Sequence, residues 1–212
     1  MAKRHKLLVC FAFLLAFGGT MPGQGIAPPL AEYRGGQKID GSFEIQNNAD
    51  FPMVTLLEAK SFAVDGRGQI AFRPLDAGIS LRMGSSSFIV RPHDARIVFY
   101  KATFPSAPAS FAIITTMTKA GAETGMRVNL VFPHLIYVYQ KDKLAKAEVS
   151  LALADGVLSI HNLSQKLGRV QSVHSSHEDL GGFPLYPGQT REVPIKGSKV
   201  TVKFEDGFKA EP

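Results

Sequence analysis

Apolar and polar residues alternate along most of the chain after residue 41. The alternation is clearest in Ile79–Met83, Val149–Leu153 and Val200–Phe204. A period of two places one face of an extended strand in a core and the other face in water. Further strands are predicted at residues 43–46, 54–59, 69–72, 97–104, 111–117, 126–139, 157–160 and 170–173. No segment after residue 30 keeps a helical period over three turns, so the pattern predicts an all-β chain.

Short segments rich in Gly, Pro and Ser separate these strands, among them Asp65–Gly68, Gly84–Ser87 and Pro105–Pro108. The strongest turn signal is Asp155-Gly156, which lies between two alternating segments. A two-residue type I′ turn needs positive φ at both positions, which Asp and Gly tolerate. About ten strands at this spacing are typical of an antiparallel sandwich.

The most charged stretch in the body of the chain is Gln140–Lys146, and the alternation resumes directly after it. We therefore expect two Ig-like antiparallel β-sandwich domains in tandem. The first would cover residues 27–140, a linker residues 141–146, and a small β domain residues 147–212. The second domain is short, and we expect it to have fewer strands than a complete sandwich.

A short repeat agrees with two such domains. Phe43–Asn47 and Leu158–Asn162 are both alternating strands that end in Asn at a turn. Asn suits this position because its side chain bonds the nearby backbone and tolerates left-handed φ. Asn162-Leu163-Ser164 also fits the glycosylation sequon, which we interpret as a coincidence of the strand end.

The first 26 residues have a different composition from the rest. The basic group Lys3–Lys6 precedes the apolar run Leu7–Phe17, which has no polar face, and Gly and Pro follow. This order is typical of a secretory signal peptide, predicted here at residues 1–26 with cleavage between Gly25 and Ala31.

Charge and cysteine content exclude several classes of protein. The formal charge of +6 falls to +3 when Lys3, Arg4 and Lys6 are removed, so the mature chain has no basic stripe for nucleic acid. The only cysteine, Cys10, is lost with the same segment, which excludes a disulfide or a Cys-rich metal site. No apolar run in the body reaches the roughly 20 residues of a membrane-spanning helix, so no membrane insertion of the mature chain is expected.

No motif predicts catalysis. The chain has no Gly-x-Ser-x-Gly sequence, no mature cysteine and no glycine-rich phosphate loop. The histidine cluster His174–Glu178 has a spacing of three in a Ser-rich segment, which favours a solvated loop over a zinc site. We expect no enzyme activity, no cofactor and no metal.

Met126–Tyr139 is long and strongly apolar for a strand. A central strand of a sandwich could have this composition, and that interpretation stays open. An edge strand this apolar would be an aggregation hazard unless a partner normally covers it. Pro133 favours an edge or a bulge, because proline has no N–H to donate to a ladder.

A series of weak motifs follows the chain in order: Phe43–Asn48 with Phe51-Pro52, Phe88–Pro92, Ile97–Pro105, Phe111–Met117, Met126–Tyr139 and Leu158–Asn162. Together they resemble the PapD-like periplasmic chaperones of the chaperone–usher pathway. Met126–Tyr139 corresponds to the subunit-binding G1 strand of that family. The resemblance covers most of the mature chain and suggests a divergent member, near the archaic branch.

The resemblance implies a non-enzymatic periplasmic chaperone whose partners are pilin or fibre subunits and an outer-membrane usher. Its first domain would donate the G1 strand to a subunit that lacks one strand, by β-augmentation. Met126, Val128, Leu130 and Phe132 lie on one face of that strand at period two, as donation requires. An alternative is a secreted or surface Ig-like module that recognises a protein or a glycan through its loops.

The family also uses an Arg of the first strand and a Lys of G1 to hold the subunit's C-terminal carboxylate by charge-assisted hydrogen bonds. Arg34 is the residue that could match the Arg. No Lys stands at the matching level of G1, where the chain offers Asn129 or His134, with Arg127 close by. The resemblance thus implies a subunit-binding role for Arg34, Arg127 and His134.

Overall fold

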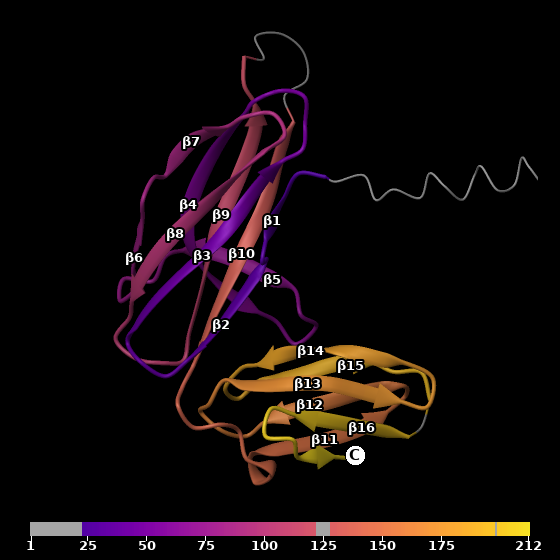
Figure 1. Ribbon diagram of the computed structural model, residues 1–212. Helices are drawn as coiled ribbons and strands as arrows, with labels where there is room; N and C mark the ends of the chain where they lie inside the picture. Colours follow the sequence, from indigo (N-terminus) through magenta and orange to yellow (C-terminus); the bar gives the residue numbers. More distant parts are fainter. Residues whose placement is uncertain (1–22, 122–127, 198) are drawn as a thin grey trace, which may run out of the picture.

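The computed structural model describes residues 23–121, 128–197 and 199–212 (Figure 1). Within these ranges the chain forms four β-sheets, and the only helical element is the short 3-10 turn η1 (Lys146–Glu148). The prediction of an all-β chain is therefore confirmed. The predicted signal peptide lies almost entirely outside the described residues.

Two sheets lie between residues 25 and 139 and pack face to face (Figure 1). Sheet A has the order β1-β3-β8-β6, and sheet B the order β2-β10-β9-β4-β5, with β7 paired to β4. All neighbours are antiparallel except β2 and β10, which run parallel. The strands of sheet A are β1 (Gly25–Ala27), β3 (Lys38–Asn47), β8 (Asp94–Thr103) and β6 (Ser80–Met83). Those of sheet B are β2 (Leu30–Arg34), β10 (Asn129–Tyr139), β9 (Ala109–Lys119), β4 (Met53–Val64), β5 (Ile70–Pro74) and β7 (Ser87–Val90).

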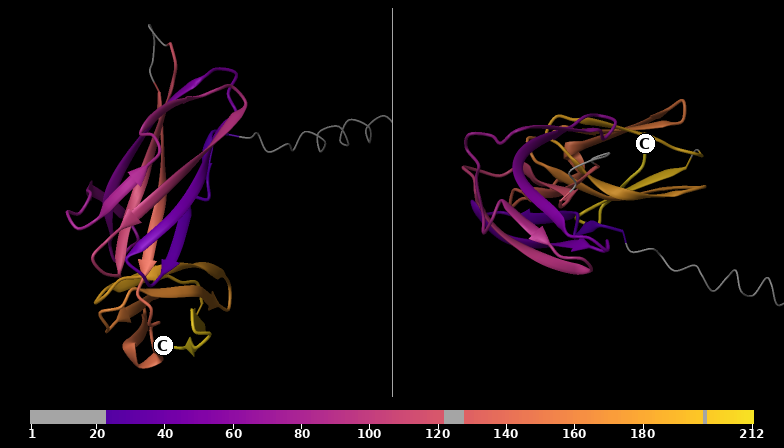
Figure 2. Two further views of the ribbon diagram at one scale, coloured as in Figure 1. Left: turned by 60° about the vertical axis from the view of Figure 1, so that its left-hand side comes forward. Right: turned by 90° about the horizontal axis from the view of Figure 1, so that it is seen from above.

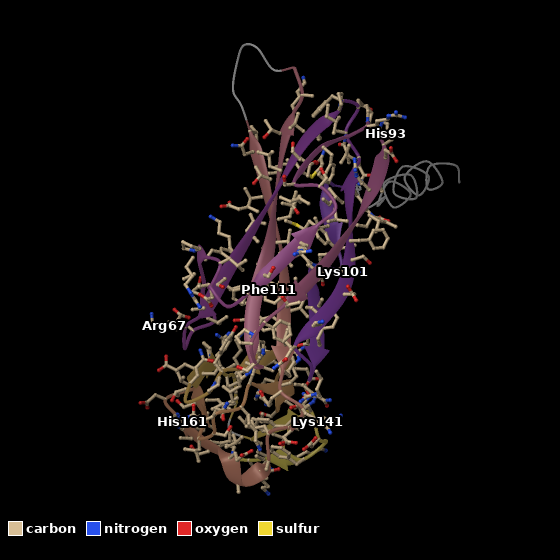
Figure 3. All side chains as sticks on the ribbon, turned by 90° about the vertical axis from the view of Figure 1, so that its left-hand side faces the viewer. Arg67, His93, Lys101, Phe111, Lys141 and His161 are labelled. Carbon is tan, nitrogen blue, oxygen red and sulfur yellow. The ribbon has the colours of Figure 1, made fainter. Side chains whose placement is uncertain are left out.

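The main core fills the space between sheets A and B. Phe43 and Ile45 of β3 and Phe111 and Ile113 of β9 are fully or almost fully buried there, each pair two residues apart as strand geometry requires. Figure 3 shows Phe111 inside this sandwich. The alternation in the sequence thus sets which face of each strand points inward.

Two further sheets lie between residues 149 and 210 and enclose a separate core. Sheet C contains β11 (Val149–Ala154), β12 (Val157–Asn162) and β15 (Thr190–Pro194). Sheet D contains β14 (Asp179–Leu185), β13 (Gly168–Ser175), β16 (Val200–Phe204) and β17 (Lys209–Ala210). These seven strands correct the expectation that the second half has fewer strands than a complete sandwich. The alternation does not reveal β14 because two Gly and one Pro interrupt it. The division of the chain at residues 141–146 stays a prediction.

The predicted turn between β11 and β12 is confirmed. Asp155 has φ of 50° and Gly156 has φ of 73°, as a type I′ turn requires. Ala154 pairs with Val157 directly across the turn. This two-residue turn fixes the register of the hairpin.

The second half packs against the end of the first (Figures 1 and 2). Leu167 and Tyr186 of the second half join an apolar cluster on the outer face of sheet B with Phe62 and Tyr137. The turn between β4 and β5 adds a backbone contact, because the amide of Glu192 donates to the Gly66 carbonyl over 2.8 Å. Figure 3 shows Arg67 of this turn at the boundary between the two halves.

Asn47, at the end of β3, joins three backbone segments of the first half. Its side chain is fully buried, and its amide donates to the carbonyls of Phe51, Val90 and Arg91 at 2.9, 3.1 and 2.9 Å. Its oxygen accepts the amide of Ala49 at 3.1 Å. One side chain therefore ties the end of β3 to the following turn and to the end of β7.

Asn162, at the end of β12, repeats this arrangement in the second half. It is fully buried and donates to the carbonyls of Lys166, Leu185 and Tyr186 at 2.6, 3.2 and 3.0 Å. Its oxygen accepts the amide of Ser164 at 3.0 Å. The short sequence repeat thus marks one structural device used twice, and the sequon asparagine lies inside the fold.

We expect Asn47→Asp to lower the free energy of unfolding by more than about 3 kcal/mol, since each buried group left without its partner costs roughly 1–3 kcal/mol. The substitution keeps the shape but turns an acceptor toward three carbonyl oxygens. Urea unfolding would measure the change. The matched control is Asn48→Asp, whose side chain makes an exposed bond to the Gly23 carbonyl. Equal losses in the two variants would contradict the role given to Asn47.

Candidate functional site

The upper part of β10 forms a free edge of sheet B. On one side, β10 pairs with β9 from Asn129 to Val138. On the other side, β2 pairs with β10 only from Leu135 to Tyr139. Within the described part of the chain, no strand pairs with Asn129–His134 on that side. A partner strand could therefore add to sheet B there.

The chain leaves this edge free because its first segment serves both sheets. β1 pairs with β3 in sheet A, and β2 pairs with β10 in sheet B. Pro28 and Pro29 connect the two strands and have no N–H for either ladder. Backbone pairing of this first segment with β10 begins where the amide of Leu135 donates to the Pro29 carbonyl over 2.9 Å.

The backbone groups on the free edge follow from that bond. The N–H of Leu135 points toward β2, and backbone groups of alternate strand residues point to the same side. Asn129 and Val131 therefore direct N–H and C=O groups to the open side. Pro133 lies in the same series, so its missing N–H costs the sheet no hydrogen bond.

Burial along β10 falls steadily toward its upper end. Ile136 and Val138 are fully buried in the main core, whereas Leu130 and Phe132 are only partly buried against it. Val128, just before the strand, is 57% exposed. The predicted residues Val128, Leu130 and Phe132 thus share one line at the open end of the sandwich. Met126 and Arg127 lie outside the described residues.

His134 lies in the core and not at the surface. The ring is fully buried and stacks on Phe43 with 4.6 Å between centroids. Nδ1–H donates to the Pro28 carbonyl over 2.8 Å, since a carbonyl can only accept. Nε2 then accepts the Tyr100 hydroxyl at 3.1 Å, and the Tyr33 hydroxyl lies 3.0 Å from that of Tyr100. Both ring nitrogens are occupied inside the chain, so in this conformation His134 offers no group to a subunit.

Arg34, at the end of β2, contacts the second half of the chain. Its Nη2 forms an ion pair with Glu205, and Nη1 donates to the Gln140 carbonyl over 2.9 Å. The guanidinium lies 5.1 Å from the centroid of the Tyr139 ring. The Glu205 carboxylate is largely buried, and its second oxygen has no hydrogen-bond partner among the described residues.

The structure places the predicted residues at two ends of one strand. Arg34 pairs with Tyr139, nine residues along β10 from Leu130, or about 30 Å at the rise of a strand. Arg34 and the apolar line therefore do not form one compact site, but both lie along the same edge.

Sequence reasoning missed the residues that hold Arg34 and its surroundings. Glu205 lies 171 residues from Arg34, in the turn after β16. Glu32 joins Arg169 at 3.1 Å and accepts the Tyr139 hydroxyl at 2.7 Å. Glu205 and Arg169 meet Arg34 and Glu32 only after the two halves pack, so no local signal marks them.

The described residues contain no group of three or more His, Cys, Asp or Glu side chains arranged to hold a metal ion. They also contain no helix that is long and apolar enough to cross a membrane.

No family model matches the chain, and no curated protein matches its sequence. The fold is similar to that in the chaperone–tip adhesion subunit pre-assembly complex CsuC–CsuE of archaic Csu pili from Acinetobacter baumannii. That match has a TM-score of 0.53 and 12% identity, and covers 90% of this chain and 98% of that chain. The E. coli chaperone DraB matches with a TM-score of 0.58 and 13% identity, over 90% of this chain and 97% of DraB. The complex of Salmonella enterica SafA pilin with the SafB chaperone matches with a TM-score of 0.58 and 11% identity, over 89% of this chain and 93% of that chain.

These similarities confirm, at the level of the fold, the resemblance to PapD-like chaperones of chaperone–usher pili. They extend over nearly the whole chain and include an archaic system. At 11–13% identity they show the architecture of two Ig-like domains and leave the activity to be argued from the site.

We expect the buried ring of His134 to make the protein less stable as pH falls below about 6.5, the ordinary pKa of histidine. Burial lowers the pKa of His134 in the folded chain, so the unfolded chain binds more protons in this window and stability falls with pH. Urea unfolding between pH 7.5 and pH 5 would measure the slope. His134→Phe should flatten it.

The matched control for this experiment is His93→Gln, because the His93 side chain is exposed and bonds only Asp50. This variant measures how far the slope changes when an exposed imidazole is removed, and His134→Phe should change it more. An unchanged slope in His134→Phe would show that other groups cause the pH dependence.

Proposed function

We propose that this chain is a non-enzymatic periplasmic chaperone that caps pilus or fibre subunits by donating the edge of β10, and then passes them to an outer-membrane usher. The observation that carries the proposal is the free edge at Asn129–His134, where Leu130 and Phe132 are only partly buried against the core. A soluble sheet protein rarely leaves so apolar an edge uncovered unless a partner takes it.

Donation of this strand would combine two kinds of contact. The N–H and C=O groups of Asn129 and Val131 would bond the backbone of the subunit's own edge strand. Val128, Leu130 and Phe132 would fill the gap left by the subunit's missing strand, since they share one line and are the least buried members of it. We extend this line to Met126 on the sequence pattern alone.

The solved structures support this proposal by analogy. The similar chain architecture occurs in a complex of a pilin with the SafB chaperone and in a complex of the CsuC chaperone with a tip adhesion subunit. We infer that the partner of this chain is likewise a fibre subunit. Delivery to an usher is the further step that this function requires.

The position of β1 indicates where the predicted signal peptide ends. β1 begins at Gly25, and the Gly23 carbonyl accepts the Asn48 amide over 2.7 Å. Cleavage after Ala27, inside the window predicted from the sequence, would remove β1 from sheet A. We therefore propose that the signal peptide ends before Gly23 and that the mature chain keeps β1 in the periplasm.

Val131→Pro is expected to abolish subunit capture with little effect on the thermal midpoint. Proline removes the N–H that Val131 directs to the open side but no hydrogen bond of sheet B, as Pro133 already shows two residues away. Capture is measured by purifying the tagged chain from periplasm and quantifying by mass spectrometry the fibre subunits that co-purify.

Val131→Thr is the matched control for this change, because it keeps the N–H and the branched side chain and should retain capture. Leu130→Glu should also abolish capture, since it would place an unpaired carboxylate in an apolar groove. Full capture by Val131→Pro would contradict strand donation at this edge.

We also propose that Arg34 binds the C-terminal carboxylate of the subunit. In the free chain the guanidinium of Arg34 forms an ion pair with the Glu205 carboxylate. A subunit carboxylate would therefore have to displace Glu205 or share Arg34 with it. The planar fork of Arg suits either arrangement.

Glu205→Gln is expected to raise subunit recovery, because Arg34 would lose its internal carboxylate but keep its charge. Arg34→Ala should lower recovery by roughly tenfold or more, since a charge-assisted bond contributes about 1.5–3 kcal/mol. Lys143→Ala, which removes the neighbouring exposed pair with Asp206, is the control. Equal recovery from wild type and Arg34→Ala would remove Arg34 from the site.

A further inference from the structure

The outer face of sheet A carries an apolar patch that nothing in the described chain covers. Phe99 and Ile97 lie two residues apart on β8 and are 68% and 55% exposed. Lys101 continues the same face of the strand, and Figure 3 shows it on the sandwich of the first half, away from the second half. This patch belongs to the opposite sheet from β10, so the proposed donation of a strand does not use it.

The neighbours of Phe99 make it project from the sheet. Its cross-strand partner on β3 is the small residue Ser42. On its other side, Gly84 follows β6, and a Cβ added at Gly84 would meet no atom within 4 Å. Phe99 therefore projects farther from the sheet than the small Ser42 beside it.

Charge is arranged in two columns on this face. Asp40 on β3 pairs with Lys101 on β8, and the two charged groups lie 3.6 Å apart in the open. Ser42 and Phe99 form the next pair of the same two columns. The column on β3 thus carries Asp40, the small Ser42 and Glu44, and the column on β8 carries Lys101, Phe99 and Ile97.

We propose that this face, defined by Asp40, Ser42, Ile97, Phe99 and Lys101, binds the same face of a second copy of the chain. A two-fold axis that runs along the strands between β3 and β8 lays β3 of one copy over β8 of the other. Asp40 then meets Lys101 of the second copy, and Phe99 packs over the small Ser42 of the second copy. Both contacts occur twice, as an isologous interface requires.

The second copy is the occupant that the charge pattern favours. In this orientation Asp40 faces Lys101, and Glu44, whose carboxylate accepts the Gln46 amide, faces the apolar Ile97. No two like charges of these columns meet. Two sheets that pack face to face keep their strands nearly aligned, which is the orientation the axis produces. The edge of β10 stays free in such a dimer because it belongs to sheet B.

Sedimentation velocity of the purified mature chain over a wide range of concentrations tests the dimer. We expect the mass to double as concentration rises, and Phe99→Ser to keep the chain monomeric throughout. Leu56→Ser is the matched control, because Leu56 is exposed to a similar degree on the outer face of sheet B, and this variant should still dimerise. Thermal midpoints would verify that both variants fold, as changes at exposed positions generally allow.

A charge exchange tests the orientation. Asp40→Lys and Lys101→Asp should each weaken the dimer at least several-fold, and the two changes together should restore it. A wild-type chain that is monomeric at every concentration overturns the proposal, whatever other partner the face has. A dimer that survives Phe99→Ser, or that the double exchange fails to restore, overturns it as well. Subunit capture by the Phe99→Ser variant separates this result from the proposed chaperone function, which does not require the dimer.

Discussion

Pro28 and Pro29 carry the chain from sheet A to sheet B, and the main features of the first half follow from this crossing. Because β1 must end in one sheet before β2 begins in the other, β2 reaches only the lower part of β10. The upper part keeps its backbone groups unpaired on the side away from β9, and Leu130 and Phe132 there are only partly buried. A first strand confined to sheet B could have covered this edge and closed the sandwich.

Such an edge is stable only if the rest of β10 is held firmly. His134 holds β10 at the point where its pairing with β2 begins, because the ring hydrogen-bonds to the Pro28 carbonyl of the crossing segment and to the Tyr100 hydroxyl in the core. A buried polar ring with both nitrogens satisfied fixes position without leaving an unpaired group in the core. The lower half of β10 is thus paired on both sides and the upper half on one. The same strand is therefore held firmly at one end and accessible to a partner strand at the other.

The local pattern predicts most strands, the Asp155-Gly156 turn and the special position of Asn47 and Asn162, because all of these depend on neighbours in sequence. It misleads at His134, since a polar residue in an apolar strand looks like a surface group until its distant partners are known. It also does not reveal Glu205 at Arg34, because that contact joins residues at opposite ends of the chain. The sequence predicts the apolar line of β10, whereas its free edge depends on where β2 stops pairing.

The late strands of the two halves, β10 and β16, differ in how far a neighbouring strand covers their outer side. Both halves use the same Asn device at the end of an early strand, so they solve the problem of joining their sheets in the same way. The late strand of the second half, β16, pairs with β13 on one side, and β17 covers Val202 and Lys203 on the other. Its inward residues Val200, Val202 and Phe204 are all buried, which leaves no apolar line at an open end. The two-residue strand β17 thus covers part of the outer side of β16, whereas within the residues described no strand covers that side of β10 before Leu135.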